Sequence, residues 1–231
     1  MNIELYADGS DLTDMVNVYR HKKYVKGFTT NPTLMRKAKV GNYLEFVGQV
    51  TDVIKDLPVS FEVFADDFPE MERQAKVLAS YGENIFVKIP VTNTKGQSTK
   101  QLVKSLLDNN IKVNVTAVFT KAQTDEFRNY LIGKTDVVFS IFAGRIADTG
   151  VDPTPIVTHA IQSMPSNVKV LWASCREVYN IYEAERAGCH IVTASSDLIC
   201  KLLLQGKDLT DYSLETVKMF YDDAKQSQYS L

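Results

Sequence analysis

The segment PVSFEVFADDFPEMERQAKVLASYGENIFVKIP (residues 58–90) decides the fold, because its pattern is that of a strand, a helix and a second strand. Residues 58–65 and 84–89 are short runs rich in β-branched and aromatic residues, which is typical of strands. Residues 68–81 have an amphipathic helical pattern, and Gly82 stands where that helix should end. A strand, a crossover helix and a parallel strand form the unit from which α/β folds are built.

The same alternation runs through most of the chain. Further strands are expected at residues 2–7, 25–30, 112–117, 135–141, 168–173 and 189–194. Further helices are expected at 11–20, 42–56, 97–109, 120–131, 153–163, 176–187 and 195–205. Eight strand–helix units predict an α/β fold of the (β/α)8 TIM-barrel type. A doubly wound parallel sheet shares this alternation, but eight repeats and the lack of a GxGxxG motif after the first strand favour the barrel.

We expect one domain, because no linker or low-complexity stretch divides the chain. Residues 1–206 form the predicted catalytic barrel, and residues 207–231 a C-terminal helical tail that belongs to the same domain. The tail carries more apolar side chains than the outside of one barrel obviously needs. They are Leu209, Tyr212, Leu214, Val217, Phe220 and Tyr221. The tail either caps the barrel's own helices or reaches a neighbouring subunit.

Composition excludes several classes of function. The 231 residues carry a formal net charge of −2, with basic and acidic residues interspersed, so neither a nucleic-acid nor a membrane surface is expected. No apolar run approaches the length of a membrane span, and the first residues show no signal-peptide pattern. The three cysteines lack CxxC spacing, so neither a disulfide framework nor a zinc site is predicted. A cytoplasmic protein is expected.

Alternation of side chains along the strands separates a helix-facing set from a lumen-facing set. The predicted helix-facing set is apolar, and it includes Ala117 in the fifth strand and Leu171 and Ala173 in the seventh. The predicted lumen-facing set is polar toward the carboxyl ends of the strands, where TIM barrels build their active sites. Its polar members are Asp8, Glu62, Lys88, Asn114, Thr116 and Ser174.

Lys88 is the most informative member of this set, because lysine is seldom fully buried. A lysine in an apolar lumen loses its proton more easily, and the free amine can attack a carbonyl carbon to form a Schiff base. The resulting iminium accepts electrons from a neighbouring C–C bond, which can then be cleaved or formed. Such chemistry needs proton carriers, for which Asp8 and Glu62 are the candidates. The alternative is a polar core network in which every group is paired.

Two loops after late strands carry the features of a phosphate site. Arg145 lies in SIFAGRIAD (140–148), and Ser174 and Arg176 lie in LWASCRE (171–177). Two guanidinium groups, a hydroxyl and an expected helix N-terminus together predict phosphate binding. The alternative is that each arginine is only a surface ion-pair partner.

These residues lie in motifs that resemble those of the transaldolases, in particular the short subfamily that also contains fructose-6-phosphate aldolase. The resemblance covers nearly the whole chain. Its motifs are LYAD (5–8), GFTTNPTLM (27–35), FEVFA (61–65), VKIPVT (87–92), NVTAVFT (114–120), FAGRIAD (142–148), WASCRE (172–177) and AGCHIVT (187–193). It implies an enzyme without metal or organic cofactor that acts on sugar phosphates. It also implies a homo-oligomer, either a decamer or a pentamer.

The resemblance assigns a role to each matching residue. Lys88 matches the Schiff-base lysine, and Asp8 the aspartate that exchanges the proton of the sugar C4 hydroxyl. Glu62 and Thr116 match the pair that holds a catalytic water. The remaining matches are substrate-binding residues. They are Thr29 and Asn31 near the reacting centre, the aromatic neighbour Phe142, and the phosphate ligands Arg145, Ser174 and Arg176.

The resemblance implies a transaldolase of the pentose phosphate pathway. It would move a dihydroxyacetone unit from sedoheptulose 7-phosphate or fructose 6-phosphate to glyceraldehyde 3-phosphate or erythrose 4-phosphate. Glu62, Phe142 and Arg176 favour this activity, because fructose-6-phosphate aldolases carry glutamine, tyrosine and lysine there. That aldolase, which releases free dihydroxyacetone, is the first alternative. A non-catalytic sugar-phosphate binding protein is the second, and the intact set of Lys88, Asp8 and Glu62 argues against it.

Overall fold

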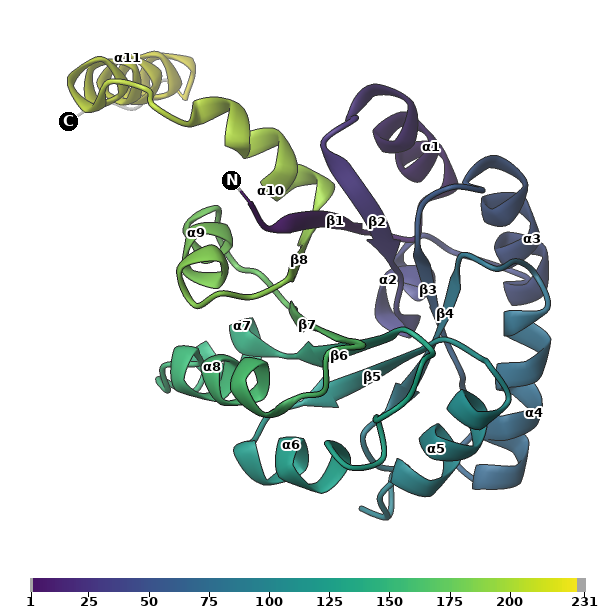
Figure 1. Cartoon of the computed structure of the whole chain (residues 1–231). Coiled ribbons are helices and arrows are strands. Elements are labelled where there is room, and N and C mark those ends of the chain that lie inside the picture. Colours follow the sequence, from purple (N-terminus) through teal and green to yellow (C-terminus); the bar gives the residue numbers. More distant parts are fainter. Residues whose placement is uncertain (1, 228–231) are drawn as a thin grey trace. The chain divides into compact units, whose positions relative to one another are not determined.

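Eight parallel strands pair in chain order and close on themselves in the computed structural model, which describes residues 2–227 (Figure 1). The strands are β1 (Glu4–Asp8), β2 (Val25–Thr29), β3 (Val59–Glu62), β4 (Ile85–Pro90), β5 (Val113–Val118), β6 (Val137–Ile141), β7 (Val168–Trp172) and β8 (Ile191–Ser195). Because β1 pairs with β8 as well as with β2, the sheet has no edge. The predicted (β/α)8 barrel is therefore confirmed.

Helices follow the strands and surround them (Figure 1). They are α1 (Leu12–His21), α3 (Tyr43–Val53), α4 (Phe68–Ala79), α5 (Lys100–Asp108), α6 (Lys121–Phe127), α8 (Thr154–Ser163) and α9 (Tyr179–Arg186), and α10 (Ser196–Lys201) follows β8. Local sequence fixes where helices begin. The Asp67 carboxylate, for example, accepts the backbone N–H of Glu70 at 3.0 Å and so caps α4. α9 begins three residues later than its amphipathic pattern predicts.

Two short helices, α2 (Pro32–Lys37) and α7 (Ala143–Ala147), were not predicted. Each directly follows the carboxyl end of a strand, β2 or β6. Their length explains the failure, since five or six residues are too few for a helical hydrophobic period to be recognised. Both helices matter for the site, because α2 begins beside Asn31 and α7 carries Arg145.

The barrel has two apolar layers. Side chains such as Phe61, Val87 and Phe139 point from the strands to the helices and are fully buried. A second cluster consists of Tyr6, Phe86, Val138, Leu171, Ala173 and Ile191. It fills part of the lumen, and two of its members, Leu171 and Ala173, also line the pocket at the carboxyl ends of the strands. The assignment of Leu171 and Ala173 to the helix-facing set was therefore wrong. Trp172, the largest side chain of β7, takes the outward position there, where it is 1% exposed.

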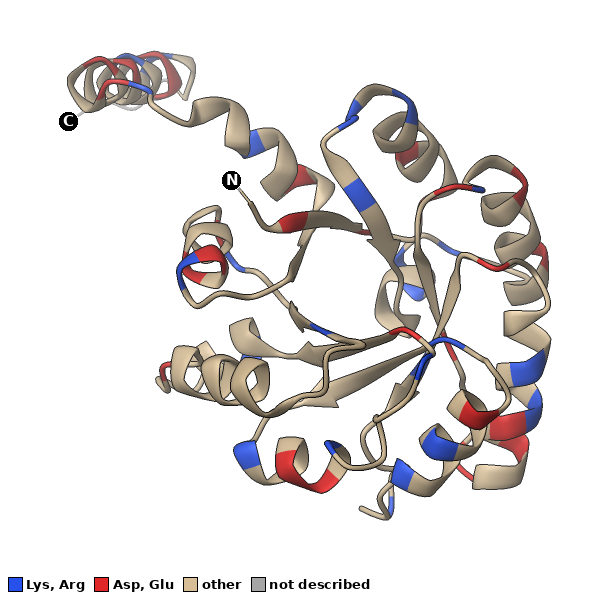
Figure 2. Ribbon diagram, viewed as in Figure 1, with Lys and Arg blue, Asp and Glu red and all other residues tan. Residues whose placement is uncertain are grey.

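Charged residues of both signs are interspersed on several of the outer helices, as Figure 2 shows. Several form pairs one helical turn apart, such as Lys76 with Glu72 on α4. Within residues 2–227, no helix combines the length and the apolar character that crossing a membrane requires.

The chain divides into two compact units, with the boundary between Ile199 and Cys200. The second unit contains a short 3-10 helix (Leu202–Leu204) and the helix α11 (Leu209–Gln226). Asp208 caps α11 by accepting the backbone N–H groups of Thr210 and Asp211. The predicted C-terminal helix is thus confirmed. That the tail belongs to the same domain as the barrel stays a prediction. Met1 of the predicted barrel segment (1–206) and residues 228–231 of the predicted tail (207–231) lie outside the described residues.

Candidate active site

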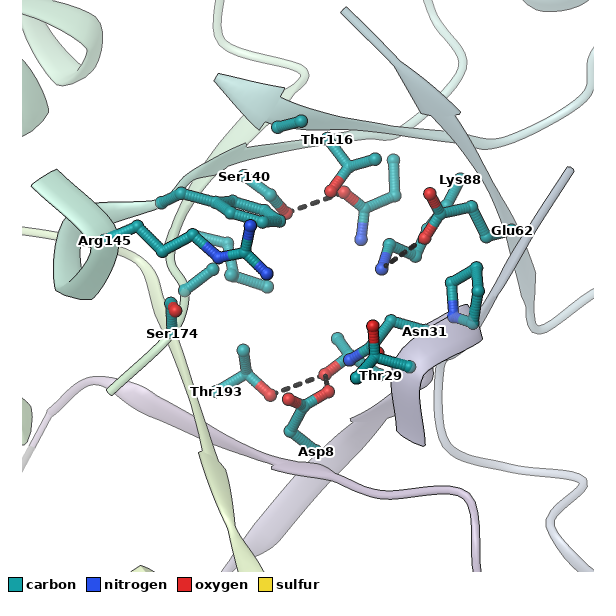
Figure 3. Close-up of a pocket in the computed structure, with 17 residues that line it drawn as sticks. Asp8, Thr29, Asn31, Glu62, Lys88, Thr116, Ser140, Arg145, Ser174 and Thr193 are labelled. Atoms are coloured by element: carbon teal, nitrogen blue, oxygen red, sulfur yellow. Dashed lines mark hydrogen bonds and ion pairs between the residues drawn. The ribbon is translucent and has the colours of Figure 1, made fainter. Parts of the chain in front are cut away.

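A pocket of about 270 Å³ lies at the carboxyl ends of the strands (Figure 3). Nine of the ten predicted site residues line it. They are Asp8, Thr29, Asn31, Glu62, Lys88, Thr116, Phe142, Arg145 and Ser174. The exception is Arg176. The parallel strands all end at the same side of the barrel, so residues far apart in the sequence converge there.

Lys88 projects from the middle of β4 and is only 5% exposed. Its Nζ donates a hydrogen bond to the carbonyl oxygen of Thr30 at 2.7 Å and lies 3.0 Å from Oε2 of Glu62. Glu62 is the register partner of Lys88 on β3, so the two side chains leave neighbouring strands toward the same lumen. A buried cation needs such partners. The arrangement holds the amine at the pocket wall beside a carboxylate that can accept its proton.

Asp8 ends a directed hydrogen-bond chain. The Thr29 hydroxyl donates to Oδ1 of Asp8 at 2.7 Å, and the Thr193 oxygen lies 2.6 Å from that of Thr29. A hydroxyl has one proton to donate, so Thr193 must donate to Thr29. Burial raises the pKa of Asp8 above its usual value, while the Lys88 charge and the Thr29 bond lower it in part. Asp8 therefore holds a proton more readily than an ordinary aspartate, as a proton-exchanging group requires.

Asn31 has two functions in the structure. Its side-chain oxygen accepts the backbone N–H of Leu34 at 3.0 Å and caps α2, whose first residue is Pro32. The cap uses the oxygen and leaves the amide NH2 group, which belongs to a side chain that lines the pocket. Asn31 can therefore donate hydrogen bonds to hydroxyl groups of a substrate.

The β5 wall of the pocket combines a fixed amide with a free hydroxyl. Ser140 donates to Oδ1 of Asn114 at 2.7 Å, and Nδ2 of Asn114 donates to Ser60 at 3.1 Å, which sets the orientation of the amide. By contrast, the buried Thr116 hydroxyl makes no hydrogen bond with any residue in the described part of the chain. Thr116 lines the pocket, and a buried hydroxyl left without a protein partner there points to a water or a substrate group as the missing partner.

Two residues of the pocket have left-handed backbone conformations. Ala117 has φ +59° and Ser174 has φ +69°, each of which costs about 1–3 kcal/mol in a residue other than glycine. At both points the alternation of faces is interrupted. Ala117 joins Thr116 in the pocket, and Ser174 joins Ala173. The expectation that Ala117 faces the helices is therefore wrong, and the β5–β6 register shifts at the same place.

Arg145 and Ser174 form one side of the pocket, called the arginine wall below, where α7 meets the end of β7. A Cβ atom on Gly144 would lie 1.6 Å from the carbonyl oxygen of Ser174, so only glycine allows this approach. The contact brings Arg145 and Ser174 to one side of the pocket (Figure 3). The Arg145 guanidinium lies 5.5 Å from the centre of the Phe142 ring, a cation–π distance. Within residues 2–227, Arg145 forms no ion pair with a carboxylate.

Arg176 lies outside the pocket lining and is paired with Asp148. Its Nε lies 3.0 and 3.1 Å from the two carboxylate oxygens, and its Nη2 also contacts Asp148. Both side chains are about half exposed, at 49% and 50%. Since α9 begins only at Tyr179, the expected helix N-terminus does not follow directly on Arg176. A contribution of Arg176 to a phosphate site stays a prediction.

Sequence reasoning missed several lining residues, of which Thr193 is the most important. Alternation along β8 is a signal that could have found it, because Thr193 follows the lumen-facing Ile191 by two residues. Thr33 was missed because it belongs to the unpredicted helix α2. Within residues 2–227, no group of three His, Cys, Asp or Glu side chains is placed to hold a metal ion.

Comparison with known proteins identifies the family. The model of the family described as "Transaldolase/Fructose-6-phosphate aldolase" matches residues 5–231. The chain is 31% identical over 229 residues to a "Probable transaldolase" of Nitrosopumilus maritimus, with 96% of each chain covered. It is 33% identical over 195 residues to "Probable transaldolase 2" of Listeria monocytogenes, which covers 83% of this chain and 84% of that one.

Solved structures share the fold. The crystal structure of KGPDC from Streptococcus mutans superposes with a TM-score of 0.56 and covers 99% of each chain. At 15% sequence identity, this likeness concerns the barrel architecture alone.

Proposed function

Because the chain belongs to the transaldolase/fructose-6-phosphate aldolase family, we propose that it is a transaldolase that forms a Schiff base on Lys88. It moves a dihydroxyacetone unit from sedoheptulose 7-phosphate or fructose 6-phosphate to glyceraldehyde 3-phosphate or erythrose 4-phosphate. One observation carries the proposal. A buried lysine and two carboxylates, Asp8 and Glu62, point into the same pocket at the carboxyl ends of the strands (Figure 3).

The first step joins the ketose to the enzyme. Glu62, 3.0 Å from the amine, accepts a proton from Lys88, and the free amine adds to the C2 carbonyl. The carbinolamine then loses one water to give an iminium. Glu62 and the unpartnered Thr116 hydroxyl both line the pocket, so they can hold the water that carries protons in this step.

The second step breaks the C3–C4 bond of the sugar. Asp8 accepts the proton of the C4 hydroxyl, whose oxygen becomes the carbonyl of the departing aldose. The electron pair of the broken bond moves between C2 and C3, and the iminium becomes a neutral enamine. The raised pKa of Asp8 suits it to take up this proton and to return it.

The third step transfers the unit. The enamine carbon attacks the aldehyde of the acceptor, and Asp8 returns its proton to the new hydroxyl. Addition of one water to the iminium then releases the new ketose and regenerates the Lys88 amine. The water lost in the first step balances the water added here. The donor's C4 is oxidised to an aldehyde and the acceptor's aldehyde carbon is reduced to a carbinol, so the transfer needs no external oxidant or reductant.

The arginine wall suits the phosphate end of the substrates. The Arg145 guanidinium is available to an anion, and guanidinium groups bind phosphate oxygens through paired N–H donors. The Ser174 hydroxyl lines the same wall. The wall lies across the pocket from Lys88, so a substrate can contact both (Figure 3).

Phe142 favours transfer over release of free dihydroxyacetone. Its ring lines the pocket and packs against Phe119 at 5.7 Å between ring centres. A phenol at this position would supply a proton donor and a water anchor beside the enamine, which would then be protonated and released. Phenylalanine has no such donor, so the enamine persists until an acceptor aldehyde arrives.

An acceptor-dependence assay tests the proposal. Consumption of fructose 6-phosphate is expected to need erythrose 4-phosphate and to produce sedoheptulose 7-phosphate, whereas the Lys88→Met variant produces none. Efficient release of dihydroxyacetone without an acceptor would indicate the alternative, a fructose-6-phosphate aldolase. Neither activity, together with measurable binding of fructose 6-phosphate, would indicate a non-catalytic sugar-phosphate binding protein.

The proposal extends to the setting of the reaction. We propose that the enzyme acts in the pentose phosphate pathway, to which the proposed substrates belong, and in the cytoplasm. A homo-oligomer, a decamer or a pentamer, is also proposed, since the second unit buries none of the apolar side chains of α11 by itself. These include Leu209, Leu214, Val217 and Phe220. Light scattering at several concentrations tests the oligomer, and a mass of one chain throughout would contradict it.

A further inference from the structure

The two arginines near the proposed phosphate end differ in their partners. Arg145 lines the pocket and has no carboxylate in ion-pair contact among the described residues. Arg176 follows the pocket residue Ser174 by two positions, but two of its three guanidinium nitrogens, Nε and Nη2, are directed to Asp148. A carboxylate of the chain itself therefore holds the second guanidinium.

Asp148 interacts electrostatically with both arginines through its carboxylate. It caps the end of α7, the helix that carries Arg145, through a backbone hydrogen bond to the Gly144 carbonyl at 3.0 Å. The hydrogen bond from Arg176 lowers the pKa of Asp148, and the charges of Arg176 and Arg145 lower it further. Asp148 is therefore ionised at neutral pH. A negative charge gains nothing from the C-terminal end of a helix, where cations are favoured.

We propose that Asp148 is a specificity-determining residue whose carboxylate competes with the substrate's phosphate group for Arg176. A guanidinium binds a carboxylate and a phosphate through the same paired N–H donors, so one anion can replace the other. In the free protein, Asp148 occupies Arg176. When a phosphate monoester binds at Arg145 and Ser174, Arg176 leaves Asp148 and joins it. The inference rests on the proposed function for the identity of the substrate.

The exchange is energetically accessible. Both partners of the ion pair are about half exposed, and such pairs contribute little to stability. The backbone can stay in place during the exchange, because the N–H of Arg176 is fixed by a 2.8 Å hydrogen bond to Oδ1 of Asn180. The competition weakens phosphate binding relative to two free arginines, so phosphorylated products leave more readily.

Binding of inorganic phosphate to the full chain tests this competition without any chemistry. Asp148→Asn keeps the shape of the side chain and removes the competing charge, so the phosphate dissociation constant is expected to fall about two- to fivefold, the range given by one surface ion pair. Adding Arg176→Gln to Asp148→Asn should abolish the gain. Asp152→Asn is the matched control, since this exposed carboxylate accepts the backbone N–H of Thr154 and contacts no arginine in the described structure. Unchanged or weaker binding by Asp148→Asn would overturn the inference.

A second measurement uses the unaltered protein. In a crystal structure with inorganic phosphate bound at Arg145, Arg176 should contact the phosphate and the pair with Asp148 should be broken. An intact pair beside bound phosphate contradicts the competition. Borohydride trapping on Lys88 separates the two proposals. Trapping without a change in phosphate affinity refutes the role of Asp148 alone, and a tighter phosphate site without trapping refutes the transaldolase alone.

Discussion

Glu62 and Lys88 are register partners on β3 and β4, and their charged groups lie 3.0 Å apart with side chains 15% and 6% exposed. The pair neutralises a charge that the barrel could not otherwise bury. It also places a proton acceptor beside the proposed nucleophile. The stability of the barrel and the proposed reaction therefore depend on the same contact, and mutations can change the stability without restoring the reaction.

Removing one partner of this pair should destabilise the barrel. Lys88→Met leaves the Glu62 carboxylate without its cation, which is expected to lower the free energy of unfolding by about 3 kcal/mol. Adding Glu62→Gln removes the orphaned charge and should restore most of the loss, while activity stays absent. Urea unfolding of both variants measures this. If the double variant were less stable than Lys88→Met, the pair would not be the cause.

The raised pKa of Asp8 predicts a pH-dependent cost to stability. The folded protein keeps the Asp8 proton at pH values where the unfolded chain has lost it, so the free energy of unfolding falls as pH rises between the two pKa values. The window begins near the unfolded value of 3.8 and closes above the folded pKa. Asp8→Asn has no such cost and still accepts the Thr29 bond. Its advantage over the wild type should therefore grow across this window, as measured by urea unfolding from about pH 4 to pH 8. A variant less stable than the wild type at neutral pH would contradict this cause.

Phe142→Tyr should raise cleavage of fructose 6-phosphate in the absence of acceptor. The new phenol would stand beside the enamine and provide the proton that releases dihydroxyacetone. The measurement is free dihydroxyacetone formed without an aldehyde, compared with the transfer rate. Phe119→Tyr is the matched control, because Phe119 packs against Phe142 but does not line the pocket. No increase in release by Phe142→Tyr would remove the argument from the missing hydroxyl.

Gly144→Ala should damage both stability and phosphate recognition. Its Cβ atom would meet the Ser174 carbonyl at 1.6 Å, so α7 and the end of β7 must separate. Overpacking of this kind costs about 1–3 kcal/mol, and the displaced Arg145 should raise the KM for phosphorylated substrates. Gly133→Ala is the control, since nothing lies within 4 Å of the added carbon. A Gly144→Ala variant as stable and active as the control would show that the close approach is unimportant.

The fold could be predicted because barrel strands and helices differ in period. Each of the eight strands was expected within a few residues of its observed bounds, and closure followed from the count alone. The short helices α2 and α7 could not be predicted, since they are held by local contacts. The Asn31 cap and the close approach at Gly144 are examples, and neither produces a periodic pattern.

The site was predictable where strands alternate regularly and not where they stop doing so. Alternation placed Lys88 and Glu62 in the lumen, as observed. It failed at Ala117, where the backbone has a left-handed conformation. It also failed in β7, where the large Trp172 side chain faces the helices and Leu171 faces the lumen, the opposite of what was expected. The pairing of Arg176 with Asp148 depends on side-chain torsions in two separate segments of the chain, and a periodic sequence pattern carries no information about such torsions.

The proposed mechanism depends on a Schiff base between Lys88 and a ketose phosphate. The most direct test is borohydride reduction during incubation with fructose 6-phosphate at neutral pH, followed by mass spectrometry of the peptide that contains Lys88. A stable sugar adduct on Lys88 is expected, formed also by Asp8→Asn, in which imine formation precedes the blocked cleavage. An unmodified Lys88 in the wild type, with fructose 6-phosphate bound, would contradict it.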